Sequence, residues 1–124
     1  MNEHEQEILK LFYYDPMGHF HIREIARQTG LDTKTVIKYL DKFTQKKLIL
    51  RKKKRNGFPY YEANLLSRFY RYEKSHAIME KLFESGIIDY LEKEINPKVM
   101  IVYGSIRKGV YHPKSDIDIF VQAK

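Results

Sequence analysis

Two aspartates near the C-terminus are the residues of this sequence best suited to chemistry. Asp116 and Asp118 stand two positions apart in the run Asp-Ile-Asp-Ile-Phe-Val, where polar and apolar residues alternate. Alternation predicts a strand, and residues i and i+2 of a strand share one face. Two carboxylates on one face repel each other unless a cation lies between them, and Mg²⁺ shared with substrate phosphates satisfies that arrangement. We therefore expect a magnesium site at Asp116 and Asp118.

A glycine and a serine precede this pair. Gly104 and Ser105 directly follow the apolar run 99–103, which predicts a buried strand. A Gly-Ser turn offers backbone N–H groups and a hydroxyl, so it can hold a phosphate. The Gly-Ser pair alone and the Asp-x-Asp pair alone are weak signals. Here the Gly-Ser pair lies at the end of a predicted strand and the aspartates lie within another, with twelve residues from Gly104 to Asp116. The alternative is a structural β-hairpin with exposed acids and no ligand.

Basic residues form a second candidate site in the segment 34–55. This segment holds ten Lys or Arg against Asp41 alone, a net charge of +9, whereas the whole chain carries +7. Concentrated positive charge indicates an anionic partner, and nucleic acid is one such partner. The alternative for any run of charged residues is a face that is simply exposed to solvent. Which of the two applies depends on the helices or strands that carry the segment.

The first half of the chain predicts three helices. Acidic residues in the first turn and apolar spacing predict a helix over 3–14, and apolar spacing also predicts helices at about 22–29 and 33–46. Gly30 stands in the turn between the last two, where a left-handed conformation is usual, and Asp32 is placed to cap the helix that follows.

A hairpin is predicted after the third helix. Asn56-Gly57 lies between two extended runs, and this pair is a strong hairpin signal because both turn residues then take a positive φ. Pro59 places the second strand at an edge or near a bulge. The basic segment therefore consists of the third helix and the hairpin.

This order of elements resembles the winged helix-turn-helix family over residues 3–63, most specifically over 22–40. The resemblance implies that the helix 33–46 enters the major groove of DNA and that the hairpin 51–57 is the wing. Charge supports this, because Lys and Arg on two adjacent elements can bracket a groove. The DNA-binding residues we expect are Thr33, Lys34, Thr35, Lys38, Lys42, Arg51, Lys52, Lys53, Lys54 and Arg55. The alternative is a winged helix used for protein contact.

Residues 64–85 predict a long helix, followed by another over about 87–95. Apolar and aromatic residues repeat in the first helix at spacings of 4, 3, 4, 3 and 4: Leu65, Phe69, Tyr72, His76, Met79 and Phe83. Such a seam suggests self-association, and a DNA-binding protein gains from two-fold symmetry. We expect a homodimer through 65–83; the alternative is a helix packed on its own domain.

The C-terminal segment, about 87–124, resembles the nucleotidyltransferase superfamily with the DNA polymerase β-like fold, especially its small microbial members. The motif that carries the resemblance spans 103–119. It implies that Gly104, Ser105 and Lys108 hold a nucleoside triphosphate (NTP) and that Asp116 and Asp118 are catalytic and bind Mg²⁺. The family's third carboxylate comes from a later strand, and this sequence ends at Lys124. We therefore expect weak metal binding, and either a fragment of a longer protein or a degenerate domain.

Together these patterns predict an α+β protein of three parts. The parts are a winged helix-turn-helix DNA-binding domain (1–63), a linker or dimerisation helix (64–86) and a partial, truncated nucleotidyltransferase-like α/β unit (87–124). The expected function is binding of double-stranded DNA in transcription regulation. The alternative is an Mg²⁺-dependent enzyme that moves a nucleotidyl group from an NTP to a hydroxyl of a protein, RNA or small molecule. A third class is a protein-interaction module.

The composition limits the kinds of site that the chain can form and where the protein is expected to be located. Cysteine is absent, so disulfides and thiolate metal sites are excluded and an intracellular location is permitted. The acidic N-terminus lacks the apolar segment of a signal peptide, and no stretch approaches eighteen apolar residues. We expect a cytoplasmic protein that does not span a membrane.

Overall fold

The structure is a computed structural model of the 124-residue chain, and it describes residues 2–95, 97–103 and 118–123. Side-chain surroundings are described for 2–94. The chain divides into two compact units, Met1–Tyr70 and Arg71–Lys124, which we call the N-terminal and C-terminal units.

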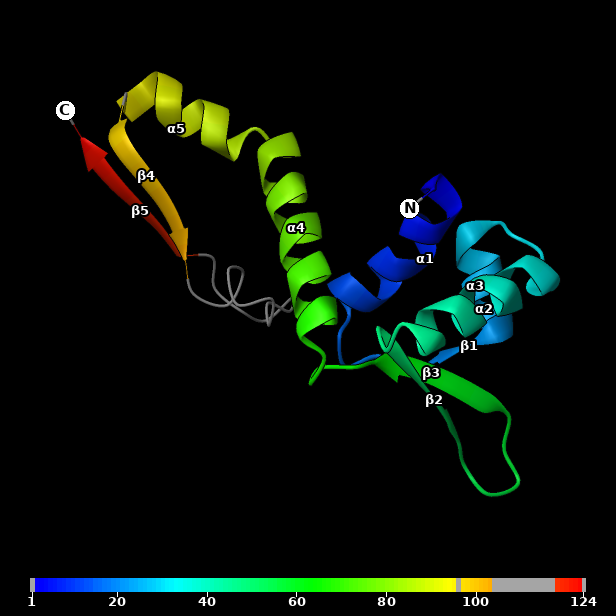
Figure 1. Ribbon diagram of the computed structural model, residues 1–124. Coiled ribbons are helices and arrows are strands. Elements are labelled where there is room, and N and C mark those ends of the chain that lie inside the picture. The colour runs from blue at the N-terminus through cyan, green and yellow to red at the C-terminus, as the bar shows by residue number, and fades with distance from the viewer. Residues whose placement is uncertain (1, 96, 104–117, 124) are drawn as a thin grey trace. The chain divides into compact units, whose positions relative to one another are not determined.

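The N-terminal unit contains the three predicted helices (Figure 1). They are α1 (Glu3–Tyr14), α2 (Ile22–Thr29) and α3 (Thr33–Gln45). The predicted bounds are confirmed for α1 and α2, and α3 ends one residue earlier than expected.

Local signals fix where these helices begin and end. The Asn2 side chain caps α1 by accepting a hydrogen bond from the Glu5 backbone N–H at 2.9 Å. The Asp32 side chain caps α3 in the same way, and Gly30 ends α2 with a positive φ of 74°. The predictions for Gly30 and Asp32 are therefore confirmed.

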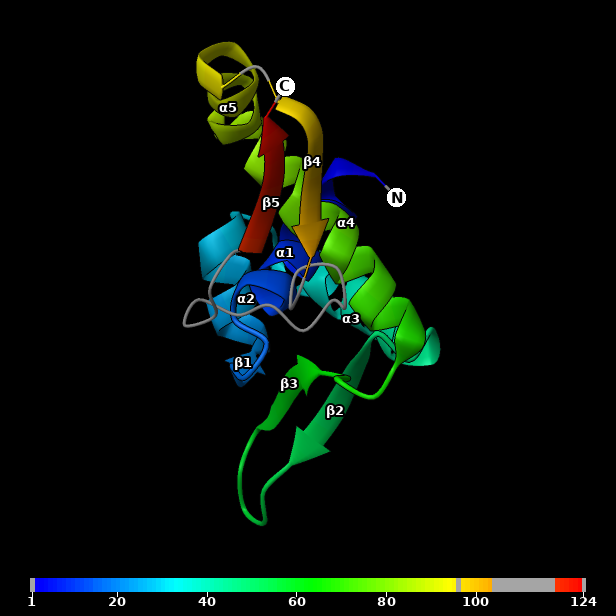
Figure 2. The same cartoon turned by 90° about the vertical axis from the view of Figure 1, so that its left-hand side faces the viewer.

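A three-stranded antiparallel sheet completes the N-terminal unit. Its strands are β1 (Phe20–His21), β2 (Ile49–Lys53) and β3 (Pro59–Ala63), in the order β1-β3-β2. Strands β2 and β3 form the predicted hairpin, which extends away from the three helices (Figure 2).

The turn of the hairpin differs from the prediction. Asn56 has a positive φ of 62° but Gly57 does not, so the expectation for Gly57 is wrong. The β2–β3 ladder ends at the pair Lys53–Pro59, and a turn is closed by a bond from the Gly57 N–H to the Lys54 carbonyl at 2.9 Å. Proline has no N–H to extend a ladder, so the strands stop at Pro59 and the connection is longer than two residues.

The core of the N-terminal unit lies between the helices and the sheet. The rings of Phe12 and Phe20 meet edge to face with centroids 5.0 Å apart, which joins α1 to β1. Tyr70 donates a hydrogen bond from its hydroxyl to the Phe12 carbonyl at 2.8 Å. The fully buried side chains include Ile8, Leu9, Phe12, Ile25, Val36, Leu40, Phe43, Leu48 and Ile49.

The long helix α4 (Arg68–Glu84) begins four residues later than predicted. Residues 64–67 form a turn closed by a bond from the Ser67 N–H to the Asn64 carbonyl at 3.1 Å, and the Ser67 hydroxyl then accepts from the Tyr70 N–H. Serine in this position starts a helix, because its oxygen satisfies an N–H of the first turn. Leu65, the first residue of the predicted seam, therefore precedes the helix.

The C-terminal unit continues with α5 (Ile87–Ile95), β4 (Pro97–Tyr103) and β5 (Asp118–Ala123). Gly86 joins α4 to α5 with a φ of 84°. Strands β4 and β5 pair antiparallel. The chain is thus an α+β protein, as expected. None of the helices in the described residues is long and apolar enough to cross a membrane.

Candidate functional site

One face of α3 is buried and the opposite face is exposed. Val36, Leu40 and Phe43 face the core, as their spacing predicted. Thr33, Lys34, Ile37, Lys38 and Asp41 are exposed. Three of the predicted site residues, Thr33, Lys34 and Lys38, therefore share the outer surface of one helix.

Thr35 forms hydrogen bonds with Asp32, the residue that caps α3. Its hydroxyl donates to Asp32 Oδ1 at 2.5 Å, and its N–H donates to Asp32 Oδ2 at 3.3 Å. The hydroxyl hydrogen bond is the main cause that lowers the pKa of Asp32 below its usual value. Thr35 thus stands apart from the exposed residues of the helix.

Lys42 forms an ion pair that the sequence did not predict. Its ammonium lies 3.0 Å from both carboxylate oxygens of Glu5, and this pair joins α3 to α1. Glu5 is buried, and the Asn2 side-chain amide also donates to it at 3.1 Å. The charge of Lys42 is therefore paired within the chain, whereas Lys34 and Lys38 form no ion pair within residues 2–94.

The basic run of the hairpin is exposed along its whole length, from Arg51 to Arg55. Lys52 lies with its ammonium 2.5 Å from Glu62 Oε1, and this hydrogen bond raises the pKa of Lys52 above its usual value, with the negative charge of Glu62 adding to it. Within residues 2–94, Lys52 is the one member of the run that pairs with an acid. We call the other four, Arg51, Lys53, Lys54 and Arg55, the hairpin cations.

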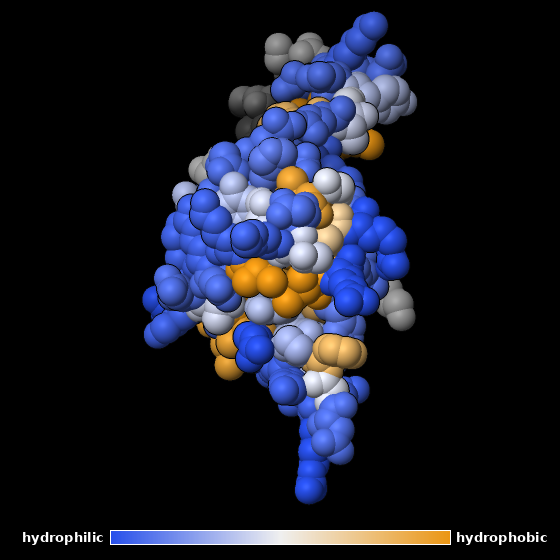
Figure 3. Space-filling view, turned by 90° about the vertical axis from the view of Figure 1, so that its right-hand side faces the viewer, coloured by the Kyte–Doolittle hydropathy of each residue, from blue (hydrophilic) through white to orange (hydrophobic). Residues whose placement is uncertain are grey.

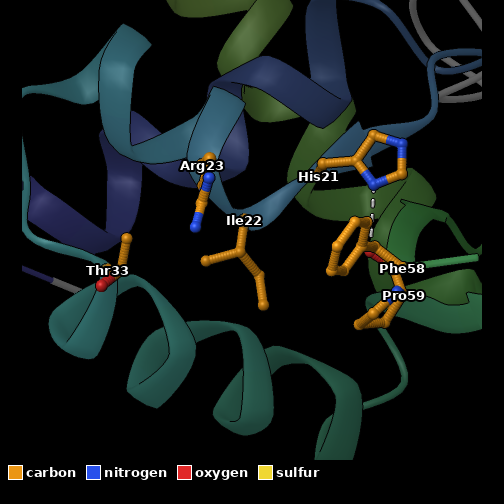
Figure 4. Close-up of a pocket in the computed structure, with 6 residues that line it drawn as sticks. All are labelled: His21, Ile22, Arg23, Thr33, Phe58 and Pro59. Atoms are coloured by element: carbon orange, nitrogen blue, oxygen red, sulfur yellow. Dashed lines mark hydrogen bonds between the residues drawn. The ribbon is translucent and has the colours of Figure 1, made fainter.

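A pocket lies between the start of α2, the start of α3 and the hairpin (Figure 4). Its volume is about 380 Å³. We call it the hairpin pocket, and it is lined by His21, Ile22, Arg23, Thr33, Phe58 and Pro59. Sequence reasoning missed it because it is assembled from three separated segments. The only local signal was an apolar residue, Phe58, close to a run of cations.

Apolar side chains are also exposed near these cations. Phe58 is 84% exposed, and Ile37 and Leu50 are exposed on α3 and β2. In the space-filling view, hydrophilic surface surrounds a smaller group of hydrophobic side chains, and the lower end, where the hairpin lies, is strongly hydrophilic (Figure 3). The surface of the N-terminal unit therefore combines charge with apolar contact area.

The outer side of α4 carries most of the predicted dimer seam. Tyr72 and Phe83 are 59% and 55% exposed, and Phe69 and His76 are exposed as well. The Tyr72 and His76 rings contact each other edge to face, with centroids 4.5 Å apart. This face is not covered by the described part of the chain.

Lys74 is a buried residue of α4 that sequence reasoning did not single out. Its side chain is fully buried, and its ammonium has no hydrogen-bond partner in the described part of the chain. Burial lowers the pKa of Lys74 from 10.5 to about 8.

The C-terminal site is described only at its edge. In the β4–β5 pair the register partner of Tyr103 is Asp118, so the last residue of β4 and the first of β5 lie at the same end of the sheet. Gly104 follows Tyr103 directly in the sequence. Gly104, Ser105, Lys108 and Asp116 lie outside the described residues.

Comparison with known proteins bears on this C-terminal site. No curated protein matches the chain. A family model described as polymerase beta, nucleotidyltransferase matches residues 85–124, two residues more than the expected segment. The matched segment contains α5, β4, β5 and all five residues of the expected nucleotide and metal site. The nucleotidyltransferase assignment of this segment is thereby supported, and the match does not reach residues 1–84.

Proposed function

We propose that the N-terminal unit is a winged helix-turn-helix domain that binds double-stranded DNA and acts in transcription regulation. The element order supports this: helix, strand, helix, helix and a two-stranded hairpin, with β1 added to the outer edge of β3. The left-handed Gly30 between α2 and α3 supports it as well. In this proposal α3 enters the major groove and the hairpin is the wing.

The observation that carries the proposal is the position of the cations that form no ion pair within residues 2–94. Lys34 and Lys38 lie on the outer face of α3, and the four hairpin cations lie on β2 and the turn that follows it. Within residues 2–94 none of these six forms an ion pair, whereas Lys42 and Lys52 do. These six cations lie on two elements of one unit, so they can contact the phosphates on both sides of a DNA groove.

The two elements have different roles in this proposal. Residues of α3 reach base edges, where Thr33 and Lys38 offer hydrogen bonds and exposed Ile37 offers apolar contact to a thymine methyl group. The hairpin cations contact the backbone, which carries no sequence information directly.

Selection of binding sites from random duplexes tests these roles. Thr33→Ala and Lys38→Ala should weaken binding to the selected duplex more than binding to a random one. Lys53→Ala and Arg55→Ala should weaken both about equally. Equal losses on both duplexes for all four variants would show that α3 does not read sequence.

A second candidate function is nucleotidyl transfer, and the family match to 85–124 favours it. We propose that Gly104, Ser105 and Lys108 hold the triphosphate of an NTP and that Asp116 and Asp118 hold Mg²⁺. Two carboxylates on alternate residues are the oxygen ligands that Mg²⁺ prefers, and the metal would neutralise charge on the phosphates. The acceptor would be a hydroxyl of a protein, RNA or small molecule.

Calorimetry with MgATP and the other NTPs, together with a labelled-NTP transfer assay, tests the second candidate. Asp116→Asn combined with Asp118→Asn should abolish the metal-dependent part of NTP binding, and Ser105→Ala should weaken NTP binding with less effect on the metal. Duplex binding should be unchanged in both variants, since these residues lie outside the N-terminal unit. Metal-independent NTP binding, or no NTP binding by the wild type, would contradict this assignment.

A further inference from the structure

The hairpin pocket lies between the two elements that the proposed function places on DNA. Thr33, at the start of α3, lines one side, and Phe58 and Pro59 line the other. Phe58 follows the hairpin cations after two turn residues. A DNA strand that runs from α3 to the hairpin therefore passes this pocket.

The lining of the pocket has an apolar part and a cationic part. Ile22, Phe58 and Pro59 supply apolar surface, and Arg23 supplies a guanidinium. Figure 4 shows Ile22 and Arg23 projecting from the first turn of α2 toward α3. Among the described residues that line the pocket, none is acidic. This combination suits a ligand with a negative charge next to an apolar body, since a guanidinium fork matches phosphate geometry.

The sugar and phosphate of one nucleotide form a ligand of this kind. In a duplex the flat faces of the bases are stacked on each other. The deoxyribose is then the apolar surface that a protein meets along the backbone, directly beside a phosphate. Phe58, which is 84% exposed, offers a ring for such a contact without any rearrangement of the core.

We propose that the hairpin pocket seats one nucleotide of the bound duplex, with its phosphate at Arg23 and its deoxyribose against Ile22, Phe58 and Pro59. This proposal rests on the proposed DNA-binding function. It adds α2 and the start of β3 to an interface that otherwise consists of α3 and the hairpin cations.

The shape of the pocket is set before DNA binds. His21 Nδ1 donates a hydrogen bond to the Pro59 carbonyl at 3.1 Å, and His21 is the register partner of Tyr60 in the sheet. These bonds hold the start of α2 against the start of β3. A pre-formed site avoids the cost of ordering its parts on binding.

Loss of an apolar contact and loss of a phosphate contact have different effects on the salt dependence of binding. The slope of log K against log salt reports the number of phosphates neutralised, whereas an apolar contact shifts K without changing the slope. Phe58→Ala should therefore lower K about tenfold at every salt concentration with an unchanged slope, as expected when an apolar ring loses part of its buried contact with the sugar. Phe58→Tyr should keep most of the affinity.

Arg23→Gln should make the slope less steep by about one, the amount that one phosphate contributes. Met17→Ala and Arg27→Gln are matched controls: Met17 is an exposed apolar residue and Arg27 an exposed arginine of α2, and neither lines the pocket. Both controls should bind nearly as the wild type does.

The outcomes separate this proposal from the function on which it rests. A wild type that binds duplex with a steep slope, combined with Phe58→Ala and Arg23→Gln variants that match their controls, would overturn the pocket proposal alone. A wild type with no salt-dependent duplex binding would overturn both. A Phe58→Ala variant with a changed slope would show that the ring does not act through an apolar contact.

Discussion

Lys38 and Lys42 stand one helical turn apart on α3, yet their surroundings differ. Lys38 is exposed, whereas Lys42 binds both oxygens of buried Glu5. Lys42→Ala leaves the Glu5 carboxylate without its cation, so it should lower the free energy of unfolding by about 1–3 kcal/mol. Lys38→Ala should leave stability nearly unchanged. Urea unfolding followed by circular dichroism measures both.

The same pair should behave in the opposite way in DNA binding. Lys38→Ala should weaken duplex binding, and Lys42→Ala should do so less, because the Lys42 charge is already paired. A Lys42→Ala variant that is as stable as the wild type but loses as much affinity as Lys38→Ala would contradict this account of the ion pair.

The basic segment could be identified from the sequence, but which of its cations form ion pairs could not. Lys42 and Glu5 are 37 positions apart, so no local pattern connects them. Glu5 is one of the acidic residues in the first turn that favour the helix over 3–14, but this pattern does not indicate its ion pair with Lys42. Lys52 and Glu62 face each other only after the hairpin sets its register.

At the scale of elements, helix bounds were predictable where the capping residue is local. Asp32 and Gly30 mark the ends that they were expected to mark. The start of α4 was missed because the turn before Ser67 interrupts an apolar repeat that continues through it. The hairpin pocket could not be predicted at all, since the first turn of α2 and the start of β3 meet only in the folded sheet.

Helix α4 provides a test of stability against pH through Lys74. Burial lowers the pKa of Lys74 to about 8 from 10.5, so between these values the unfolded chain binds more protons than the folded chain. Stability should therefore rise with pH over that window. Lys74→Met should raise the free energy of unfolding at pH 7, by on the order of 1–3 kcal/mol, because it removes a buried charge that no residue in the described part of the chain pairs with.

The gain from Lys74→Met should shrink as pH rises from about 8 toward 10.5. Lys93→Met, at an exposed lysine of α5, is the matched control and should show neither effect. Thermal unfolding at several pH values measures both variants. A Lys74→Met variant less stable than the wild type at pH 7 would mean that the ammonium has a partner in solution.

At the scale of the whole molecule, we propose that two copies associate through the seam of α4, where Met79 is half-buried and the other seam side chains are exposed. Phe69→Glu combined with Met79→Glu should give a monomer, because each buried apolar side chain contributes on the order of 1.5–3 kcal/mol. Leu66→Glu combined with Tyr90→Glu changes two exposed apolar residues outside the seam and should leave the dimer intact. Light scattering that finds the wild type monomeric at high concentration would rule the seam out.

The two units differ in how far sequence could predict them. The motif of the C-terminal unit is a short linear pattern, so its resemblance to the nucleotidyltransferases could be seen in residues 103–119, and the family match to 85–124 agrees with that resemblance. In the N-terminal unit, the order of elements was predictable from periodicity and turn residues. The function proposed for this unit depends on which cations remain without an ion pair on the folded surface, and only the structure could show this.

The salt dependence of duplex binding tests the central claim most directly. Lys34, Lys38 and the hairpin cations should displace counterions from roughly five phosphates, so log K should fall with log salt at a slope of about −4 to −5. The measurement is a titration of labelled duplex DNA with the full chain at salt concentrations between about 50 and 200 mM. A slope near zero, or no binding at the lowest salt, would contradict the account.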